Sequence, residues 1–378
     1  MVSLNQADAA LAAAQIVVLK VGSALLVDEE SNAINAEWLA GIASDIAALR
    51  AAGKSVIVVS SGAIALGNRA LGMTHTPTQL EDKQAAAAAG QVVLAHAWME
   101  ALALHDIRTA QILLSPEDTE TRRRHLNARA TIRTLIGLGA VPVVNENDTV
   151  ATSEIRFGDN DRLAARVGAM ISADMLVLLS DVDGLYTADP RNDPNAQHLV
   201  SIEKLSNDVM QMAGAANASY ASGGMVTKLE AARIATYAGC AMLICDGRNK
   251  QPLQSLADGA RSTLFHPQAS PLAARKQWIA GALSPKGSVS VDEGAVLAMK
   301  KGRSLLPAGV TSADGEFERG DLINVKNHAG DVIGHGLSAY SVDDTKTISG
   351  HKSREIEILL GYRGRDEIIH ADNLVMVE

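Results

Sequence analysis

Short apolar runs, separated by longer helical patterns, are the feature that most limits the folds open to this chain. The runs cover residues 15–21, 55–59, 107–113, 141–144, 175–179 and 241–244. Apolar residues at helical spacing fill most of the intervals, at residues 35–52, 84–104, 124–138 and 161–171. Strands buried on both faces read as continuous apolar runs, and their alternation with helices is typical of βαβ units. We therefore predict an α/β domain with an open, mostly parallel sheet sandwiched by helices.

The sequence changes character after about residue 265. Pro267, Pro271 and Pro285 punctuate a connecting region in which residues 272–281 have a helical pattern. Beyond it, short strand-like segments at residues 288–291, 322–325, 331–337 and 373–377 are broken by glycines. A chain of 378 residues is also too long for one average domain. We predict a catalytic domain over residues 1–268, a linker over 269–285, and a small β-barrel-like domain over 286–378.

Composition excludes several classes of function. The net charge is −9 and aromatic residues make up 3% of the chain, so neither general attraction to nucleic acid nor a base-stacking surface is expected. The two cysteines, Cys240 and Cys245, cannot build a disulfide framework and do not form a metal-binding pattern. Residues 1–14 lack the features of a signal peptide, and no apolar run approaches transmembrane length. We expect a cytoplasmic protein with no membrane partner.

A dense polar cluster follows the apolar run at residues 141–144. The chain continues with Asn145 and Asp148, and a second cluster includes Asn160 and Asp161. In open α/β sheets, ligands bind just beyond the carboxyl ends of the strands, so this cluster is a candidate site. The alternative is a solvated loop, because Asn and Asp are also common turn formers.

Two earlier strand ends carry groups that could hold phosphate. Lys20 lies inside an apolar run, where it would lose hydration unless it is paired or faces a ligand. The alternative is a lysine on an edge strand whose ammonium group reaches solvent. Ser61 and Gly62 precede a helical stretch, whose N-terminal amides could bind an anion. An ordinary helix cap would explain the same residues.

Two later segments offer further candidates. Ser180 and Asp181 end the run at residues 175–179, and Asp181 could bind a metal or a ribose, although a nearby Asp-Gly pair also signals a turn. A Gly-Gly turn precedes a helix that contains Lys228, and this helix start could hold phosphates; a plain turn with a solvated lysine is the alternative. The glycine and lysine spacing of a P-loop is absent. The dinucleotide-binding fingerprint is also absent, and its absence argues against a Rossmann dehydrogenase.

Six motifs, taken in order, resemble those of the amino acid kinase family. They are Lys-Val-Gly-Ser at residues 20–23, Val-Ser-Ser-Gly-Ala at 59–63, Val-Asn-Glu-Asn-Asp-Thr-Val at 144–150, Phe-Gly-Asp-Asn-Asp at 157–161, Asp-Gly-Leu-Tyr-Thr-Ala-Asp-Pro-Arg at 183–191 and Gly-Gly-Met-Val-Thr-Lys at 223–228. Residues 281–378, with Val-Asp-Glu-Gly-Ala at 291–295 and Ser-Leu-Leu-Pro at 304–307, look like a PUA domain. Each motif is weak alone, but the ordered set is specific and covers nearly the whole chain.

The resemblance implies an activity and its partners. It implies ATP-dependent phosphorylation of the side-chain carboxylate of L-glutamate, the first step of proline biosynthesis, with Mg²⁺ accompanying ATP. Inhibition by proline and assembly into a homo-oligomer are further implications. Small departures are Ser180, where many relatives have Thr, and Ala221-Ser222 before the Gly-Gly pair.

The resemblance also assigns roles to residues. Lys20 and Lys228 would act on the ATP phosphates, and Asp161 would orient these two lysines. Ser61, Asp148 and Asn160 would bind glutamate. The resemblance leaves the ligands of Mg²⁺ unassigned. ATP would be held by a longer set, namely Lys20, Ser180, Asp181, Ser222, Gly223, Gly224, Met225, Val226, Thr227 and Lys228.

Two alternatives remain at this point. One is another carboxylate kinase on the same fold, such as an aspartokinase-like enzyme, which only substrate profiling would separate. The other is an RNA-binding protein, because PUA domains elsewhere bind RNA. Residues 286–378 contain 11 Lys and Arg against 15 Asp and Glu. This net charge of −4 argues against RNA, whose binding depends on neutralising phosphates.

Overall fold

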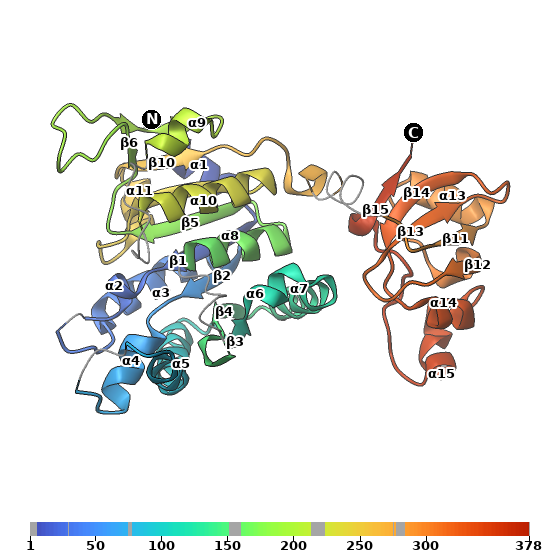
Figure 1. Cartoon of the computed structure of the whole chain (residues 1–378), viewed down its shortest axis with the longest axis horizontal. Coiled ribbons are helices and arrows are strands. Elements are labelled where there is room, and N and C mark those ends of the chain that lie inside the picture. Colours follow the sequence, from blue (N-terminus) through green and yellow to red (C-terminus); the bar gives the residue numbers. More distant parts are fainter. Residues whose placement is uncertain are drawn as a thin grey trace. The chain divides into compact units, whose positions relative to one another are not determined.

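The computed structural model describes residues 6–28, 30–74, 78–150, 160–212, 224–274, 276 and 284–377. The chain forms two compact units, Met1–Pro271 and Leu272–Glu378. Figure 1 shows the elements of each unit along the chain. The two units are considered separately below.

Unit 1 is built on one large sheet. Within the described residues this sheet has eight strands in the order β3-β4-β2-β1-β5-β9-β10-β8. Every pairing in it is parallel except that of β10 with β9. The strands are β1 (Ile16–Val21), β2 (Ser55–Ser60), β3 (Thr109–Leu114), β4 (Val141–Glu146), β5 (Met175–Ser180), β8 (Ser201–Ile202), β9 (Ala241–Asp246) and β10 (Ser262–Phe265). A separate hairpin pairs β6 (Leu185–Tyr186) with β7 (His198–Leu199).

Helices cover both faces of this sheet. One buried apolar cluster joins one face to α1 (Gln6–Ala13), α2 (Ser23–Leu26), α3 (Ala36–Ala51), α5 (Leu80–Ala103) and α11 (Pro252–Ala257). A second cluster joins the other face to α7 (Arg122–Gly137), α8 (Asn160–Ile171) and α10 (Met225–Tyr237). The first cluster also includes Ala63 and Leu66 of α4 (Ala63–Ala70). The remaining helical segments are α6 (Pro116–Glu120), η1 (Asp148–Val150) and α9 (Asn207–Gln211).

The central strand β1 directs one lysine toward α8. Successive side chains of a strand point to opposite faces. Val17, Leu19 and Val21 pack into the cluster with α3, whereas Val18 packs into the cluster with α8 and α10. Lys20 shares the face of Val18. Because β1 has β2 on one side and β5 on the other, it also lies where the chain order of the sheet reverses, which is where open α/β sheets bind ligands.

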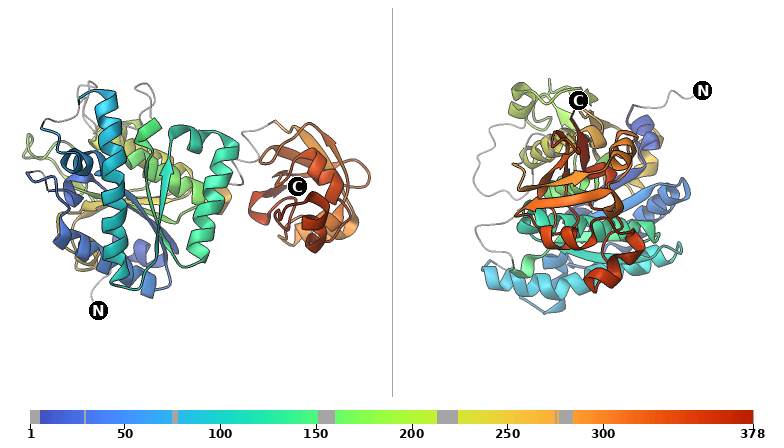
Figure 2. Two further views of the ribbon diagram at one scale, coloured as in Figure 1. Left: turned by 90° about the horizontal axis from the view of Figure 1, so that it is seen from below. Right: turned by 90° about the vertical axis from the view of Figure 1, so that its right-hand side faces the viewer.

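Two helices beside the sheet cross with their backbones in close approach. A Cβ added to Gly67 on α4 would lie 1.6 Å from the carbonyl oxygen of Ala86 on α5. A Cβ added to Gly90 would lie 1.7 Å from the carbonyl oxygen of Ala63, the first residue of α4. Only glycine fits at either position. The long α5 is visible in the left view of Figure 2.

Unit 2 contains a smaller mixed sheet in the order β12-β11-β13-β14-β15. Among these described strands, β11 and β13 are parallel and the other neighbours are antiparallel. A separate apolar core, which includes Phe317 and Tyr340, fills the unit. The elements are β11 (Gly287–Val291), α13 (Glu293–Lys300), η2 (Pro307–Gly309), β12 (Val310–Gly315), β13 (Leu322–Lys326), β14 (Val332–Leu337), α14 (Val342–Ile348), η3 (Ser353–Glu355), α15 (Ile356–Leu360), η4 (Ala371–Asn373) and β15 (Leu374–Met376).

The predicted fold class is confirmed: a mostly parallel α/β sheet with helices on both faces, and a small C-terminal sheet. The six predicted strands of unit 1 exist, with shifted ends; the third begins at Thr109 rather than at residue 107. The sequence reading did not predict α1, β8, β10 or β12. The helix expected over residues 272–281 falls largely outside the described residues. In the part of the chain that the structure describes, no helix is long and apolar enough to cross a membrane.

Candidate active site

The carboxyl ends of five neighbouring strands bring the predicted residues to one edge of the sheet. Val21 at the end of β1 lies opposite Ser60 at the end of β2. β2 in turn pairs with β4, with Val59 opposite Val144. On the other side β1 pairs with β5, whose last residue, Ser180, lies opposite Asp246 of β9. Residues far apart in the sequence therefore meet along this edge.

Asp161 holds two lysines at the centre of the edge. Its Oδ1 lies 2.5 Å from the Nζ of Lys20, and its Oδ2 lies 3.2 Å from the Nζ of Lys228. Asp161 is 1% exposed and each lysine is 8% exposed. Asp161 lies in the first turn of α8, where the helix dipole favours a negative charge. The group carries one net positive charge, which suits an anionic ligand.

Asn160, at the start of α8, is hydrogen-bonded to residues at the ends of β2 and β4. Its Nδ2 donates to Ser61 Oγ at 2.7 Å and to Asn145 Oδ1 at 3.0 Å. The Nδ2 of Asn145 donates in turn to Gln91 Oε1 on α5 at 2.9 Å. Asn145 and Gln91 are buried, whereas Asn160 and Ser61 are half-buried. Hydrogen-bond donors and acceptors thus surround the ends of β2 and β4.

A second residue of α5 fixes the turn after β2. Trp98, which is fully buried, donates from Nε1 to Ser60 Oγ at 3.0 Å, and that hydroxyl donates to the Ser61 carbonyl. Gly62 follows with φ of 113°, a conformation that favours glycine, and caps α4. Ser61 is therefore held in a turn whose shape is set by its neighbours.

Asp148 lies on the short helix η1, directly after β4. It is half-buried, and η1 packs against α5. Residues 151–159, which follow η1, lie outside the described part of the chain. Asp148 and Asn160, two of the predicted glutamate-binding residues, thus share an edge of the sheet with Ser61.

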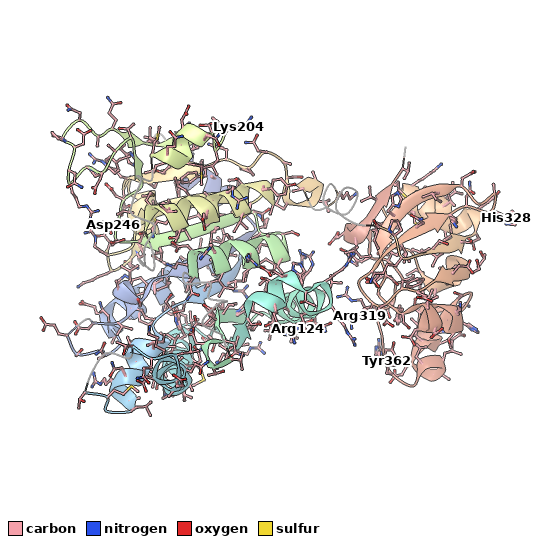
Figure 3. All side chains as sticks on the ribbon, viewed as in Figure 1. Arg124, Lys204, Asp246, Arg319, His328 and Tyr362 are labelled. Carbon is pink, nitrogen blue, oxygen red and sulfur yellow. The ribbon has the colours of Figure 1, made fainter. Side chains whose placement is uncertain are left out.

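Two of the residues predicted to bind ATP, Ser180 and Asp181, lie at the end of β5, beside the end of β9. Ser180 Oγ donates to Asp181 Oδ1 at 3.0 Å; Ser180 is buried and Asp181 exposed. Across the strand pair, Arg248 donates to Asp246 at 2.6 Å, and this hydrogen bond lowers the pKa of the Asp246 carboxyl below its usual range. Figure 3 labels Asp246 on unit 1.

The loop after β9 is held in place through Gly247. Its N–H donates to the carbonyl of Ser180 at 2.7 Å, and its carbonyl accepts from Nε1 of the buried Trp38 at 2.6 Å. A Cβ on Gly247 would lie 2.6 Å from Leu25 Cδ1. This loop therefore supports the Ser180 end of β5.

The start of α10 carries the remaining predicted ATP residues. Gly224 is the N-cap, and Thr227 Oγ1 donates to its carbonyl at 2.8 Å. Met225 is half-buried and Val226 is 40% exposed. Two predicted residues, Ser222 and Gly223, lie outside the described part of the chain.

Several residues at this edge were not predicted to be functional. Gln91 and Trp98 lie inside an alanine-rich helical pattern, where the sequence does not distinguish either one from a residue that packs in the core. Arg248 follows a strand end, and that position was the one available signal for it. Across the described residues, no group of three or more His, Cys, Asp or Glu is arranged to hold a metal ion.

Comparison with known proteins gives consistent matches. The sequence model of the amino acid kinase family matches residues 15–246, and that of the PUA domain matches residues 287–360. The chain is 57% identical to "Glutamate 5-kinase" of Paramagnetospirillum magneticum, over 97% of this chain and 99% of that protein. It is 54% identical to "Glutamate 5-kinase" of Gluconobacter oxydans, over 97% of each chain. A solved carbamate kinase from Giardia lamblia bound to AMP-PNP is 17% identical, with a TM-score of 0.49, covering 68% of this chain and 100% of that one.

Proposed function

The chain belongs to the amino acid kinase family, and we propose that it works as a glutamate 5-kinase, which transfers the γ-phosphoryl group of ATP to the side-chain carboxylate of L-glutamate. The observation that carries this proposal is the buried Lys20–Asp161–Lys228 group at the carboxyl edge of the sheet. The identity to glutamate 5-kinases along nearly the whole chain selects the acceptor. The reaction would be the first step of proline biosynthesis.

In the proposed mechanism the two lysines stabilise charge and no residue acts as a base. A carboxylate is already nucleophilic, so catalysis reduces to positioning and electrostatic stabilisation. Lys20 and Lys228 would contact the phosphoryl oxygens, on which negative charge spreads during transfer. Asp161 would hold both ammonium groups in place, since one carboxylate reaches both.

Glutamate would bind on the β2 and β4 side of the lysines. Ser61 follows β2 and Asp148 follows β4, while Asn160 begins α8 and donates to Ser61. These residues offer a hydroxyl, a carboxylate and an amide. The ammonium group of an amino acid needs anionic or carbonyl partners, and its α-carboxylate needs donors. This mixed set provides both.

ATP would bind on the β5 and β9 side. Ser180, Asp181 and the start of α10 would hold the nucleotide, because helix N-termini favour phosphate. Mg²⁺ would enter with ATP and neutralise phosphate charge. The phosphates and water would supply most of its ligands, which is common for this ion.

The proposal is tested by ADP release with glutamate, aspartate and N-acetylglutamate as acceptors. We expect turnover with glutamate to exceed that with the other two by at least about 100-fold in kcat/KM, or about 2.8 kcal/mol of discrimination. A preference for aspartate would favour the aspartokinase-like alternative. Submicromolar, salt-dependent RNA binding together with no kinase activity would favour the RNA-binding alternative.

We further propose that proline inhibits the enzyme, that the chain forms a homo-oligomer, and that it acts in the cytoplasm. Proline inhibition rests on the proposed place of this reaction at the start of proline biosynthesis, and the same assay repeated with proline tests it. An association surface is supported by Val92, Met99 and Leu104, which are 71%, 47% and 81% exposed on or next to one helix. Sedimentation of the full chain tests the oligomer.

A further inference from the structure

Three amide side chains connect α5 to the proposed glutamate site. Gln91, on α5, is 8% exposed, and Asn145, on β4, is 3% exposed. Asn145 donates from Nδ2 to Gln91 Oε1 at 2.9 Å and accepts at Oδ1 from Asn160 Nδ2 at 3.0 Å. We refer to Gln91, Asn145 and Asn160 as the amide relay.

The relay has a fixed direction. A backbone carbonyl can only accept, and Asn160 Nδ2 lies 3.4 Å from the Ser60 carbonyl oxygen as well as 2.7 Å from Ser61 Oγ. The nitrogen of Asn160 must therefore face this side. Asn145 then presents its oxygen to Asn160 and its nitrogen to Gln91, which presents Oε1. Among the described residues, none donates to the Oδ1 of Asn160, so this oxygen is available to a ligand.

The far end of the relay carries an unpaired donor. Gln91 Nε2 is buried and has no hydrogen-bond partner among the residues that the structure describes. A buried unpaired donor destabilises the fold, and such groups are rare. Packing alone would favour an apolar side chain at this position of α5. The oxygen half of the Gln91 amide, which holds Asn145, is what distinguishes it from such a residue.

Building on the proposed function, we propose that Gln91 is a positioning residue that acts through Asn145 to hold Asn160 in place. Asn160 then offers its carbonyl oxygen to the ammonium group of glutamate. Without Gln91 Oε1, the Asn145 side chain loses one of its two hydrogen bonds and can move away from Asn160. Asn160 would then be held less firmly beside the ammonium group.

Gln91→Leu tests this role with little expected effect on folding. The substitution removes the unpaired Gln91 Nε2 but leaves Asn145 Nδ2 unpaired, so the number of buried unpaired donors stays the same. We expect the KM for glutamate to rise about tenfold, which corresponds to about 1.4 kcal/mol. The KM for ATP should change less than twofold, and the melting temperature by only a few degrees. Gln91→Glu keeps an acceptor oxygen in either protonation state and should recover most of the affinity for glutamate.

A double-mutant cycle tests whether Gln91 acts through Asn145. In an Asn145→Ala background, Gln91→Leu should add no further change in the KM for glutamate, because the connection is already lost. Additive effects, an equal rise in the KM for ATP, or an unchanged KM for glutamate in Gln91→Leu would each overturn the relay. Wild-type turnover of glutamate is measured first. A wild type inactive on glutamate overturns the proposed function, whereas an active wild type with unaffected Gln91→Leu overturns the relay alone.

Discussion

Replacing Asp161 by Asn isolates the electrostatic interaction that holds both active-site lysines. Asn has nearly the same volume, so no cavity is created. Asp161 is 1% exposed and its oxygens lie 2.5 Å from Lys20 Nζ and 3.2 Å from Lys228 Nζ. Removing one partner of a buried ion pair typically costs about 3–5 kcal/mol, because a buried charge is left uncompensated. We expect Asp161→Asn to lower the unfolding free energy of unit 1 by an amount in that range.

ATP should reverse part of this loss. Its phosphates supply negative charge to the lysines that the substitution leaves unpaired. The stabilisation gained from saturating Mg²⁺–ATP should therefore be larger in the variant than in the wild type, by about 1–2 kcal/mol through binding linkage. The variant should nevertheless turn over more slowly, since the lysines lose the group that orients them.

Urea denaturation, monitored by tryptophan fluorescence with and without Mg²⁺–ATP, measures both effects. Trp38 and Trp98 are buried in the core of unit 1 and report its unfolding. The midpoint should fall while the slope stays the same. Glu230→Gln is a matched control, because it breaks the 3.3 Å pair with Arg162 on the same two helices, where both side chains are 36% exposed. Such a pair contributes less than about 1 kcal/mol. A loss of that small size for Asp161→Asn, or one that ATP does not reduce, would refute the reasoning.

Three further substitutions test other parts of the site and the fold. Lys228→Ala should lower kcat about 10²–10³-fold with an intact circular dichroism spectrum, and near wild-type turnover would remove Lys228 from catalysis. Asp148→Ala should raise the KM for glutamate; a change confined to the KM for ATP would place Asp148 on the nucleotide side. Burial raises the pKa of Asp45 to about 6 from 3.8, so the folded state holds a proton that the unfolded state has lost. Wild-type stability should therefore fall as pH rises from 4 to 6. Asp45→Asn keeps an acceptor for the Leu253 N–H and should remove this decrease of the melting temperature between pH 4 and 6. The same decrease in the variant would show that Asp45 does not cause it.

Local pattern was enough to predict the sheet and the edge that carries the site. Lys20 stood out because a cation in a buried strand needs a partner, and the alternation of β1 turns it toward α8. The partner itself, Asp161, is 141 residues away, and its identity came from the family resemblance rather than from spacing. Strand β10 was missed because four residues carry no usable period.

The roles of the residues that support the site could not be predicted from the sequence, for a different reason. Gln91 and Trp98 contact Asn145 and Ser60, which lie 54 and 38 positions away in the sequence. Within a helix pattern rich in alanine, nothing distinguishes them from core residues. Their importance depends on which face of α5 meets the sheet, and that is decided by tertiary packing.

The glycine contacts between α4 and α5 also limit how the site can move. With Gly67 and Gly90 seated against the opposing backbone, α5 cannot slide along α4 by one turn or rotate without a steric clash. Gln91 follows Gly90 directly, and Ser61 lies two residues before Ala63, the residue that Gly90 meets. The part of the candidate site built by these residues is thus rigid. Any closure around substrate must come from elements other than this helix pair, and glutamate would meet a preformed surface here at little entropic cost.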